Sequence, residues 1–122
     1  MTGFNPKDKA WKSRLQHNYG LSSSEYNTFL KKQEGKCAIC KKTLEEGKRL
    51  SVDHSHHSGR VRGLLCSNCN IGIGHFFDKP ELLLSAYDYI KKHYEIDKDY
   101  YPEEILKRIK EYENKKSSWF GF

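Results

Sequence analysis

Side chains that can bind metals or move protons are concentrated in residues 50–70, with the sequence LSVDHSHHSGRVRGLLCSNCN. This stretch holds one aspartate, three histidines, two arginines and two cysteines. Carboxylates and imidazoles bind divalent cations, an imidazole can also accept a proton, and guanidinium groups pair with phosphates. A structural metal site needs only four ligands, so the remaining groups indicate catalysis.

The four cysteines form two pairs with the same spacing, CAIC and CSNC. Each CxxC pair can turn two thiolates toward one ion, and two pairs complete the closed tetrahedron of a structural zinc site. The 25 residues between the pairs leave room for a hairpin. Two disulfides and a redox-active CxxC are the alternatives, but a reducing compartment favours zinc. The predicted zinc ligands are Cys37, Cys40, Cys66 and Cys69.

Asp53 and His54 are then free for a second site. A carboxylate binds hard cations such as Mg²⁺, and a neutral imidazole beside it can take a proton from water. In an extended strand His54 and His56 share one face, whereas Asp53 points to the other, so a joint site requires a bend. A polar turn with solvated histidines is the alternative, and an isolated DHSHH motif would favour it.

Asn70 and two arginines extend this set of residues. Asn70 directly follows the last cysteine, where a zinc site would hold it near the hairpin, and its amide oxygen can bind a hard cation. Arg60 and Arg62 alternate along the second expected strand and could bind phosphates from one face. An ordinary turn asparagine and an exposed strand face are the alternatives.

The composition indicates a polyanionic partner and a thin core. The chain has 122 residues, of which 36% are hydrophobic, and its formal net charge is +6. A domain this polar often depends on a bound metal, and an excess of Lys and Arg favours nucleic acid as the partner. No apolar run approaches the length of a membrane helix, and the N-terminus lacks a secretion signal. We therefore expect a cytoplasmic protein with no membrane association.

The periodicity predicts an α+β chain. Helices are expected in residues 7–18, in residues 22–34 behind a capping box of Ser22 and Glu25, and in residues 102–116. Residues 49–56 and 60–66 are expected to form a hairpin. Another helix should follow Asp78 as its cap, with Pro80 in its first turn. Two apolar stripes either pack within one chain or form a dimer surface: Leu83, Tyr87, Ile90 and Tyr94, and Ile105, Leu106, Ile109 and Tyr112.

The ordered motifs CxxC, DHxH and GxVRGLLCxxCN resemble those of the phage recombination endonuclease VII family, which belongs to the HNH, or ββα-metal, nucleases. The resemblance covers about residues 24–94. It implies one nuclease domain with a small zinc-braced ββα-metal core, flanked by N- and C-terminal helices. Residues 1–23 would be a basic helical extension, and residues 95–122 a helix with an aromatic tail.

The resemblance also implies a role for each matching residue. Asp53 and Asn70 would bind a catalytic Mg²⁺ or Mn²⁺, His54 would be the general base, and His56 would polarise the scissile phosphate. The four cysteines would bind zinc. The implied function is a one-metal DNA endonuclease, in the host cytoplasm if a phage encodes it.

Three alternatives stay open at this stage. A Holliday-junction resolvase would cut branched DNA. A non-catalytic zinc module that binds DNA would explain the cysteines and the charge, but not Asp53, His54 and Asn70 together. A zinc domain that binds other proteins would use the aromatic tail. Both a monomer and a homodimer are compatible with the sequence.

Overall fold

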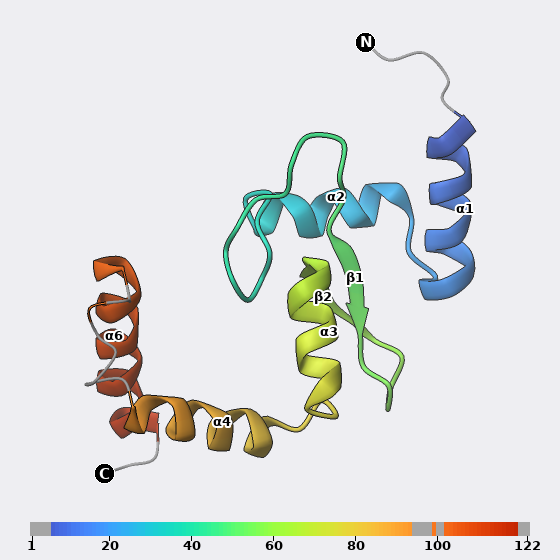
Figure 1. Ribbon diagram of the computed structural model, residues 1–122. Coiled ribbons are helices and arrows are strands. Elements are labelled where there is room, and N and C mark those ends of the chain that lie inside the picture. The colour runs from blue at the N-terminus through green and yellow to red at the C-terminus, as the bar shows by residue number, and fades with distance from the viewer. Residues whose placement is uncertain (1–5, 94–98, 100–101, 120–122) are drawn as a thin grey trace. The chain divides into compact units, whose positions relative to one another are not determined.

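The computed structural model describes residues 6–93, 99 and 102–119 (Figure 1). The chain divides into two units, Met1–Asp78 and Lys79–Phe122. The α+β prediction is confirmed. The elements are α1 (Pro6–Tyr19), α2 (Ser23–Lys32), β1 (Ser51–His54), β2 (Val61–Leu65), α3 (Ser67–His75), α4 (Pro80–Lys92) and α6 (Glu103–Trp119).

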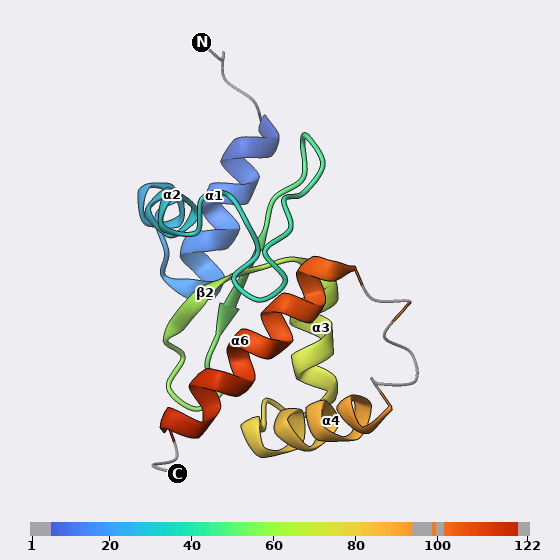
Figure 2. The same ribbon diagram turned by 90° about the vertical axis from the view of Figure 1, so that its left-hand side faces the viewer.

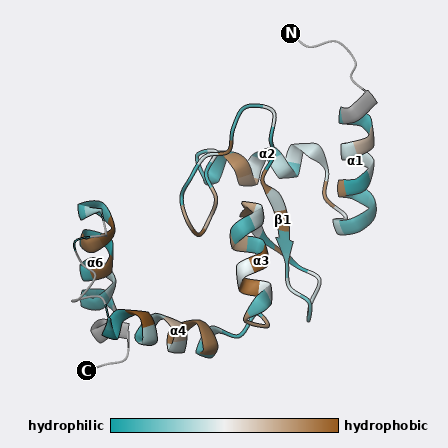
Figure 3. Ribbon diagram, in the orientation of Figure 1, coloured by the Kyte–Doolittle hydropathy of each residue, from teal (hydrophilic) through white to brown (hydrophobic). Residues whose placement is uncertain are grey.

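Helix α1 contributes to the core of the first unit, although most of its surface is hydrophilic (Figure 3). Its Leu15 is 3% exposed and packs with Leu21, which follows the helix. The N-terminal helix is therefore part of the first unit's core as well as a basic extension.

Helix α2 begins where the sequence predicts. The Ser22 hydroxyl accepts a hydrogen bond from the Glu25 backbone N–H, and the Glu25 carboxylate accepts one from the Ser22 N–H, both at 3.1 Å. This capping box satisfies two N–H groups that the first turn leaves without partners. The helix ends at Lys32, and Glu34 and Gly35 then adopt left-handed backbone conformations with φ of 55° and 73°. Gly35 adopts this conformation without the steric cost of a side chain.

The two strands form an antiparallel hairpin with a bulge at the end that carries Asp53 and His54. Asp53 lies opposite Gly63, but the next residue, His54, lies opposite Val61. Arg62 is thus an extra residue on β2. A bulge bends the strand and increases its twist, which changes the directions of nearby side chains. This register shift lies beside Asp53 and His54, the two residues of the expected joint site.

Buried residues fix the hairpin to α1 and α2, which lie beside it in the first unit (Figure 2). Val52, Leu64 and Leu65 are at most 7% exposed and share one cluster with Tyr26 of α2. The Tyr26 hydroxyl donates a 2.6 Å hydrogen bond to the Leu50 carbonyl. Burial of this phenol raises its pKa, so it stays protonated as a donor.

The Gln33 side chain pairs with the outer edge of β2. Its Oε1 accepts a 2.9 Å hydrogen bond from the Leu64 N–H, and its Nε2 donates to the carbonyls of Leu64 at 2.9 Å and Lys36 at 2.7 Å. One amide thus satisfies edge groups that a third strand would otherwise pair. Gly63 accommodates this contact, because a Cβ there would lie 3.2 Å from Gln33 Oε1.

The second unit consists of α4 and α6. The prediction that Asp78 caps α4 was wrong: the N-cap is Lys79, which makes no side-chain capping bond, and Asp78 pairs with Arg62 instead. The Tyr87 hydroxyl donates a 3.0 Å hydrogen bond to Glu113, and the rings of Tyr87 and Tyr112 lie 5.0 Å apart. The two predicted stripes therefore contact each other within one chain.

Part of the apolar surface of α4 stays exposed, including Leu83 at 36% and Ile90 at 56%. Tyr94, the last residue of its predicted stripe, and the aromatic side chains of the tail lie outside the described residues. Among the described residues, no helix is both long and apolar enough to cross a membrane.

We expect Gln33→Glu to lower the free energy of unfolding by about 1–3 kcal/mol, because a carboxylate cannot donate to the Leu64 and Lys36 carbonyls. Gln16→Glu is the matched control, since Gln16 is exposed on α1. Urea denaturation of both variants measures the difference. Equal midpoints would show that Gln33 does not stabilise the β2 edge.

Candidate metal centre and active site

The four cysteine sulfur atoms lie within 4.8 Å of one another. Zn–S bonds of about 2.3 Å place the sulfurs of a tetrahedral site about 3.8 Å apart. The Sγ atoms of Cys40 and Cys66, which come from different pairs, are 3.8 Å apart. The cluster therefore has the size and donor set of a structural metal site such as a zinc site. No other group of three or more His, Cys, Asp or Glu side chains placed to hold one ion is found in the described part of the chain.

Local backbone structure explains how each pair converges. In the first pair, residues 36–43 form a knuckle in which the Cys37 N–H donates to the Lys42 carbonyl at 3.0 Å and Lys36 bridges Thr43. The Ile39 N–H donates to the Cys37 sulfur at 3.4 Å. In the second pair, Cys66 is the N-cap of α3 and its sulfur accepts from the Cys69 N–H. Amide N–H groups thus point at sulfur in both pairs.

The electrostatics of the cluster favour a bound cation. Burial raises the pKa of the Cys37 thiol, but N–H donors, including those of Cys66, Cys40 and Ile39, outweigh it and lower the pKa to about 6. Burial and hydrogen bonds with the other three sulfurs raise the pKa of Cys69 to about 12. Without a cation, one thiolate therefore makes the next harder to form. A divalent ion removes this repulsion.

Asp53 lies at the end of β1 in a cluster of three charged groups. Arg62 donates to both of its oxygens, from Nε at 2.7 Å and Nη2 at 2.9 Å, and also to Asp78 at 2.9 Å. The Asp53 side chain is 12% exposed. The hydrogen bonds that Arg62 donates to Asp53, which outweigh the effect of burial, and its pairing with Asp78 raise the pKa of Arg62 above its ordinary value. Arg62 therefore stays charged and neutralises one of the two carboxylates.

His54 and His56 lie together, as the shared face predicts, with ring centroids 5.0 Å apart. The strand ends at His54, however, and residues after it form a turn in which the Ser55 hydroxyl accepts from the N–H groups of His57 and Ser58. The Tyr19 ring of α1 lies 5.4 Å from the His54 ring. His54 is half-buried, whereas His56 and His57 are exposed.

Asn70 lies in the first turn of α3, which packs against both strands. It is half-buried, and its N–H donates to the Cys66 carbonyl at 3.0 Å. Cys69 of the sulfur cluster and Asn70 thus lie next to each other on α3. Arg60 is exposed in the turn, away from the paired position of Arg62. His75 is exposed at the end of α3.

Three residues near the site were missed by sequence reasoning. Tyr19 contacts His54, Gln33 holds β2, and Asp78 completes the Arg62 cluster. Of these three contacts, only that of Gln33 could have been suspected from the sequence. A glycine within a strand, here Gly63, often marks a place where another group approaches the backbone closely.

Comparison with known proteins assigns the chain to a class of nucleases. The profile of the recombination endonuclease VII family matches residues 12–92. This match covers most of the chain, so the protein belongs to the recombination endonuclease VII family. The match includes α2, the hairpin, α3 and most of α1.

The similar proteins include two bacteriophage proteins and one restriction endonuclease. The Gene 59 protein of Mycobacterium phage D29 is 44% identical over 84 residues, which are 68% of this chain and 51% of the relative. The Gene 59 protein of Mycobacterium phage L5 is 40% identical over 82 residues, 66% of this chain and 50% of the relative. The chain thus spans about half the length of these relatives. Among solved structures, the beta-beta-alpha-Me type II restriction endonuclease Hpy99I matches 54% of this chain and 41% of its own, with 32% identity and a TM-score of 0.43.

We expect the purified protein to contain about one zinc ion per chain. The Cys66→Ser variant should lose both the zinc and its folded structure, because metal binding to a structural site contributes folding free energy. Asp53→Ala is the matched control, since Asp53 lies outside the sulfur cluster. Metal analysis and thermal denaturation measure both effects. A zinc-free protein with an unchanged melting curve would contradict a structural role for zinc. Loss of zinc in Asp53→Ala would show that the zinc site and the Asp53 site are not separate.

Proposed function

We propose that the protein is a metal-dependent DNA endonuclease that hydrolyses phosphodiester bonds with one divalent cation and His54 as the general base. The observation that carries this proposal is the position of Asp53 and His54 at the bulged end of β1, with the His56 ring 5.0 Å from the His54 ring, in a chain of this family. A non-catalytic zinc module would not require Asp53, His54 and His56 at one end of the hairpin.

The proposed catalytic cation is Mg²⁺ or Mn²⁺, bound by Asp53 and Asn70. Carboxylate and amide oxygens suit hard cations. A carboxylate has about four lone-pair positions, so Asp53 can bind a metal while Arg62 donates to both of its oxygens. Such an ion supplies positive charge to the leaving oxygen during phosphodiester hydrolysis.

In this proposal His54 takes a proton from the attacking water. Its ring lies between Tyr19 and His56, with centroids 5.4 and 5.0 Å away, so contacts from α1 and from the turn limit its orientation. His56 is exposed beside it and would donate to the scissile phosphate. A positioned base of this kind typically contributes about 10²–10⁴-fold to the rate.

The two arginines take different roles. Arg62 orients Asp53, as the two hydrogen bonds indicate. Arg60 is exposed at the hairpin turn and is free to contact a phosphate of the substrate. The zinc at the four cysteines is structural, because four thiolates leave no position for water.

Duplex DNA is the proposed substrate, with branched DNA as the alternative. A junction resolvase must place two active sites on one substrate, and a symmetric dimer is the simplest way to do so. The contact between Tyr87 and Tyr112 uses part of the apolar surface within one chain, which favours the duplex substrate. The relatives are phage proteins, so the proposed location is the cytoplasm of a bacterial host.

We expect His54→Ala to reduce plasmid cleavage in Mg²⁺ by about 10²–10⁴-fold while folding and DNA binding persist, because only the base is removed. His57→Ala is the matched control, since His57 is exposed in the same turn. Supercoiled plasmid converted to nicked and linear forms is quantified on gels. Near-normal turnover by the His54→Ala variant would exclude His54 as the general base. If the wild-type protein cleaved no plasmid in either Mg²⁺ or Mn²⁺, the proposal that it is an endonuclease would be wrong.

We expect linear duplex and four-way junction substrates of matched sequence to be cut at similar rates, because one active site needs only one strand. Single-turnover cleavage of the two substrates provides the measurement, and light scattering gives the oligomeric state. A stable dimer that cuts the junction far faster than the duplex would establish the resolvase instead.

A further inference from the structure

The net positive charge of the chain resides in its first unit. Residues 1–78 contain thirteen Lys and Arg against seven Asp and Glu, whereas residues 79–122 contain nine of each. The first unit thus accounts for the whole net charge of +6. A partner attracted by charge is therefore expected to bind this unit.

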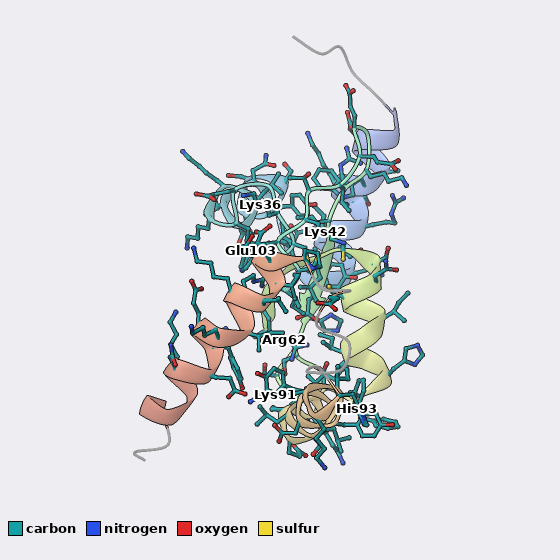
Figure 4. The ribbon with its side chains drawn as sticks, turned by 60° about the vertical axis from the view of Figure 1, so that its left-hand side comes forward. Lys36, Lys42, Arg62, Lys91, His93 and Glu103 are labelled. Carbon is teal, nitrogen blue, oxygen red and sulfur yellow. The ribbon has the colours of Figure 1, made fainter. Side chains whose placement is uncertain are left out.

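Within the first unit, five lysines gather beside the metal centre. This lysine cluster lies on the last turn of α2, on the turn that follows, and on the first knuckle (Figure 4). All five are exposed, and Glu34 is the single acidic residue between the first and the last of them. The members are Lys31, Lys32, Lys36, Lys41 and Lys42.

Hydrogen bonds fix this segment to the strand that leads to the candidate active site. Gln33 pairs with the backbone of Leu64, and the Ala38 N–H donates to the Leu64 carbonyl at 3.1 Å. Leu64 lies opposite Val52, two residues along β1 from His54, because the bulge adds Arg62 to β2 only. At about 3.3 Å per residue, this separation is about 7 Å along the strand.

Three described basic residues of the first unit outside the lysine cluster form ion pairs. Arg49 pairs with Asp8, Arg62 with Asp53 and Asp78, and Lys48 with Glu45. Among the residues that the structure describes, none of the five lysines forms an ion pair, although the Lys41 ammonium donates to the Ala38 carbonyl at 2.7 Å. Unpaired, exposed ammonium groups on a rigid support are suited to phosphates.

We propose that the lysine cluster binds the phosphate backbone of the DNA substrate, on the side of the metal centre and a few nucleotides from the bond that is cut. Phosphates of one strand recur about every 3.4 Å along the axis of a duplex, so a separation of about 7 Å parallel to that axis corresponds to about two nucleotides. This inference rests on the proposed function. It predicts binding without base specificity, because lysine contacts to phosphate carry no sequence information.

A competing role for the lysines is to offset the charge of the metal centre, since four thiolates around one Zn²⁺ leave a net charge of −2. The two roles predict that different properties change when the lysines are substituted. Lysines that bind DNA change its affinity and salt dependence, whereas lysines that neutralise the cluster change the retention of zinc.

The test replaces Lys31, Lys32, Lys36 and Lys42 with glutamine in the His54→Ala background and leaves Lys41, whose ammonium bonds within the knuckle. The matched control replaces four exposed lysines of the second unit with glutamine and changes the net charge equally: Lys92, Lys107, Lys110 and Lys115. Fluorescence anisotropy with a labelled linear duplex measures affinity over a series of salt concentrations. Metal analysis and thermal denaturation show that each protein is folded and zinc-loaded.

We expect the cluster variant to bind about tenfold or more weakly, with a log–log salt slope that is shallower by about 0.9 for each lost phosphate contact. The control should change much less in both quantities. Equal slopes and affinities in the cluster variant and its parent, with or without weaker zinc retention, would overturn the inference alone. Failure of the parent protein to bind DNA would overturn the proposed function and this inference with it.

Discussion

The convergence of two cysteine pairs on one potential metal site is the constraint on which the first unit depends. A hairpin of two short strands is only marginally stable by itself, and this one buries few side chains, chiefly Val52, Leu64 and Leu65. The sulfur cluster joins the segment before the hairpin to the helix after it. Together with the Gln33 contacts, it compensates for a thin core and places Asn70 on a helix packed against both strands.

Much of this arrangement could be predicted because its determinants are local. The CxxC spacing defines the ligands without knowledge of the fold, and the capping box of Ser22 and Glu25 lies within four residues. Alternation of polar and apolar residues identified the hairpin, although β1 ends two residues before the expected limit, at His54. The rings of His54 and His56 do lie 5.0 Å apart, but His56 is in the turn after β1 and not in the extended strand from which their shared face was predicted.

The contacts that could not be predicted join residues far apart in the sequence. Gln33 lies 31 residues from Leu64, and nothing in its local pattern distinguishes it from a solvated glutamine. Asp78 matches a helix cap by position, but the charged guanidinium of Arg62 is a stronger partner than a backbone N–H. The bulge at Arg62 depends on the register of the strands, which periodicity alone does not specify.

Arg62 connects the metal chemistry to the question of where DNA binds. Its guanidinium donates to Asp53 and Asp78, so it cannot bind a phosphate fully without giving up a carboxylate partner. With one positive and two negative charges, the cluster keeps a net charge of −1, which attracts a divalent cation and repels a phosphate that arrives without one. Electrostatic attraction of DNA must therefore come from neighbouring groups. Arg60 and the lysine cluster meet this need, because the structure shows none of them in an ion pair among the described residues.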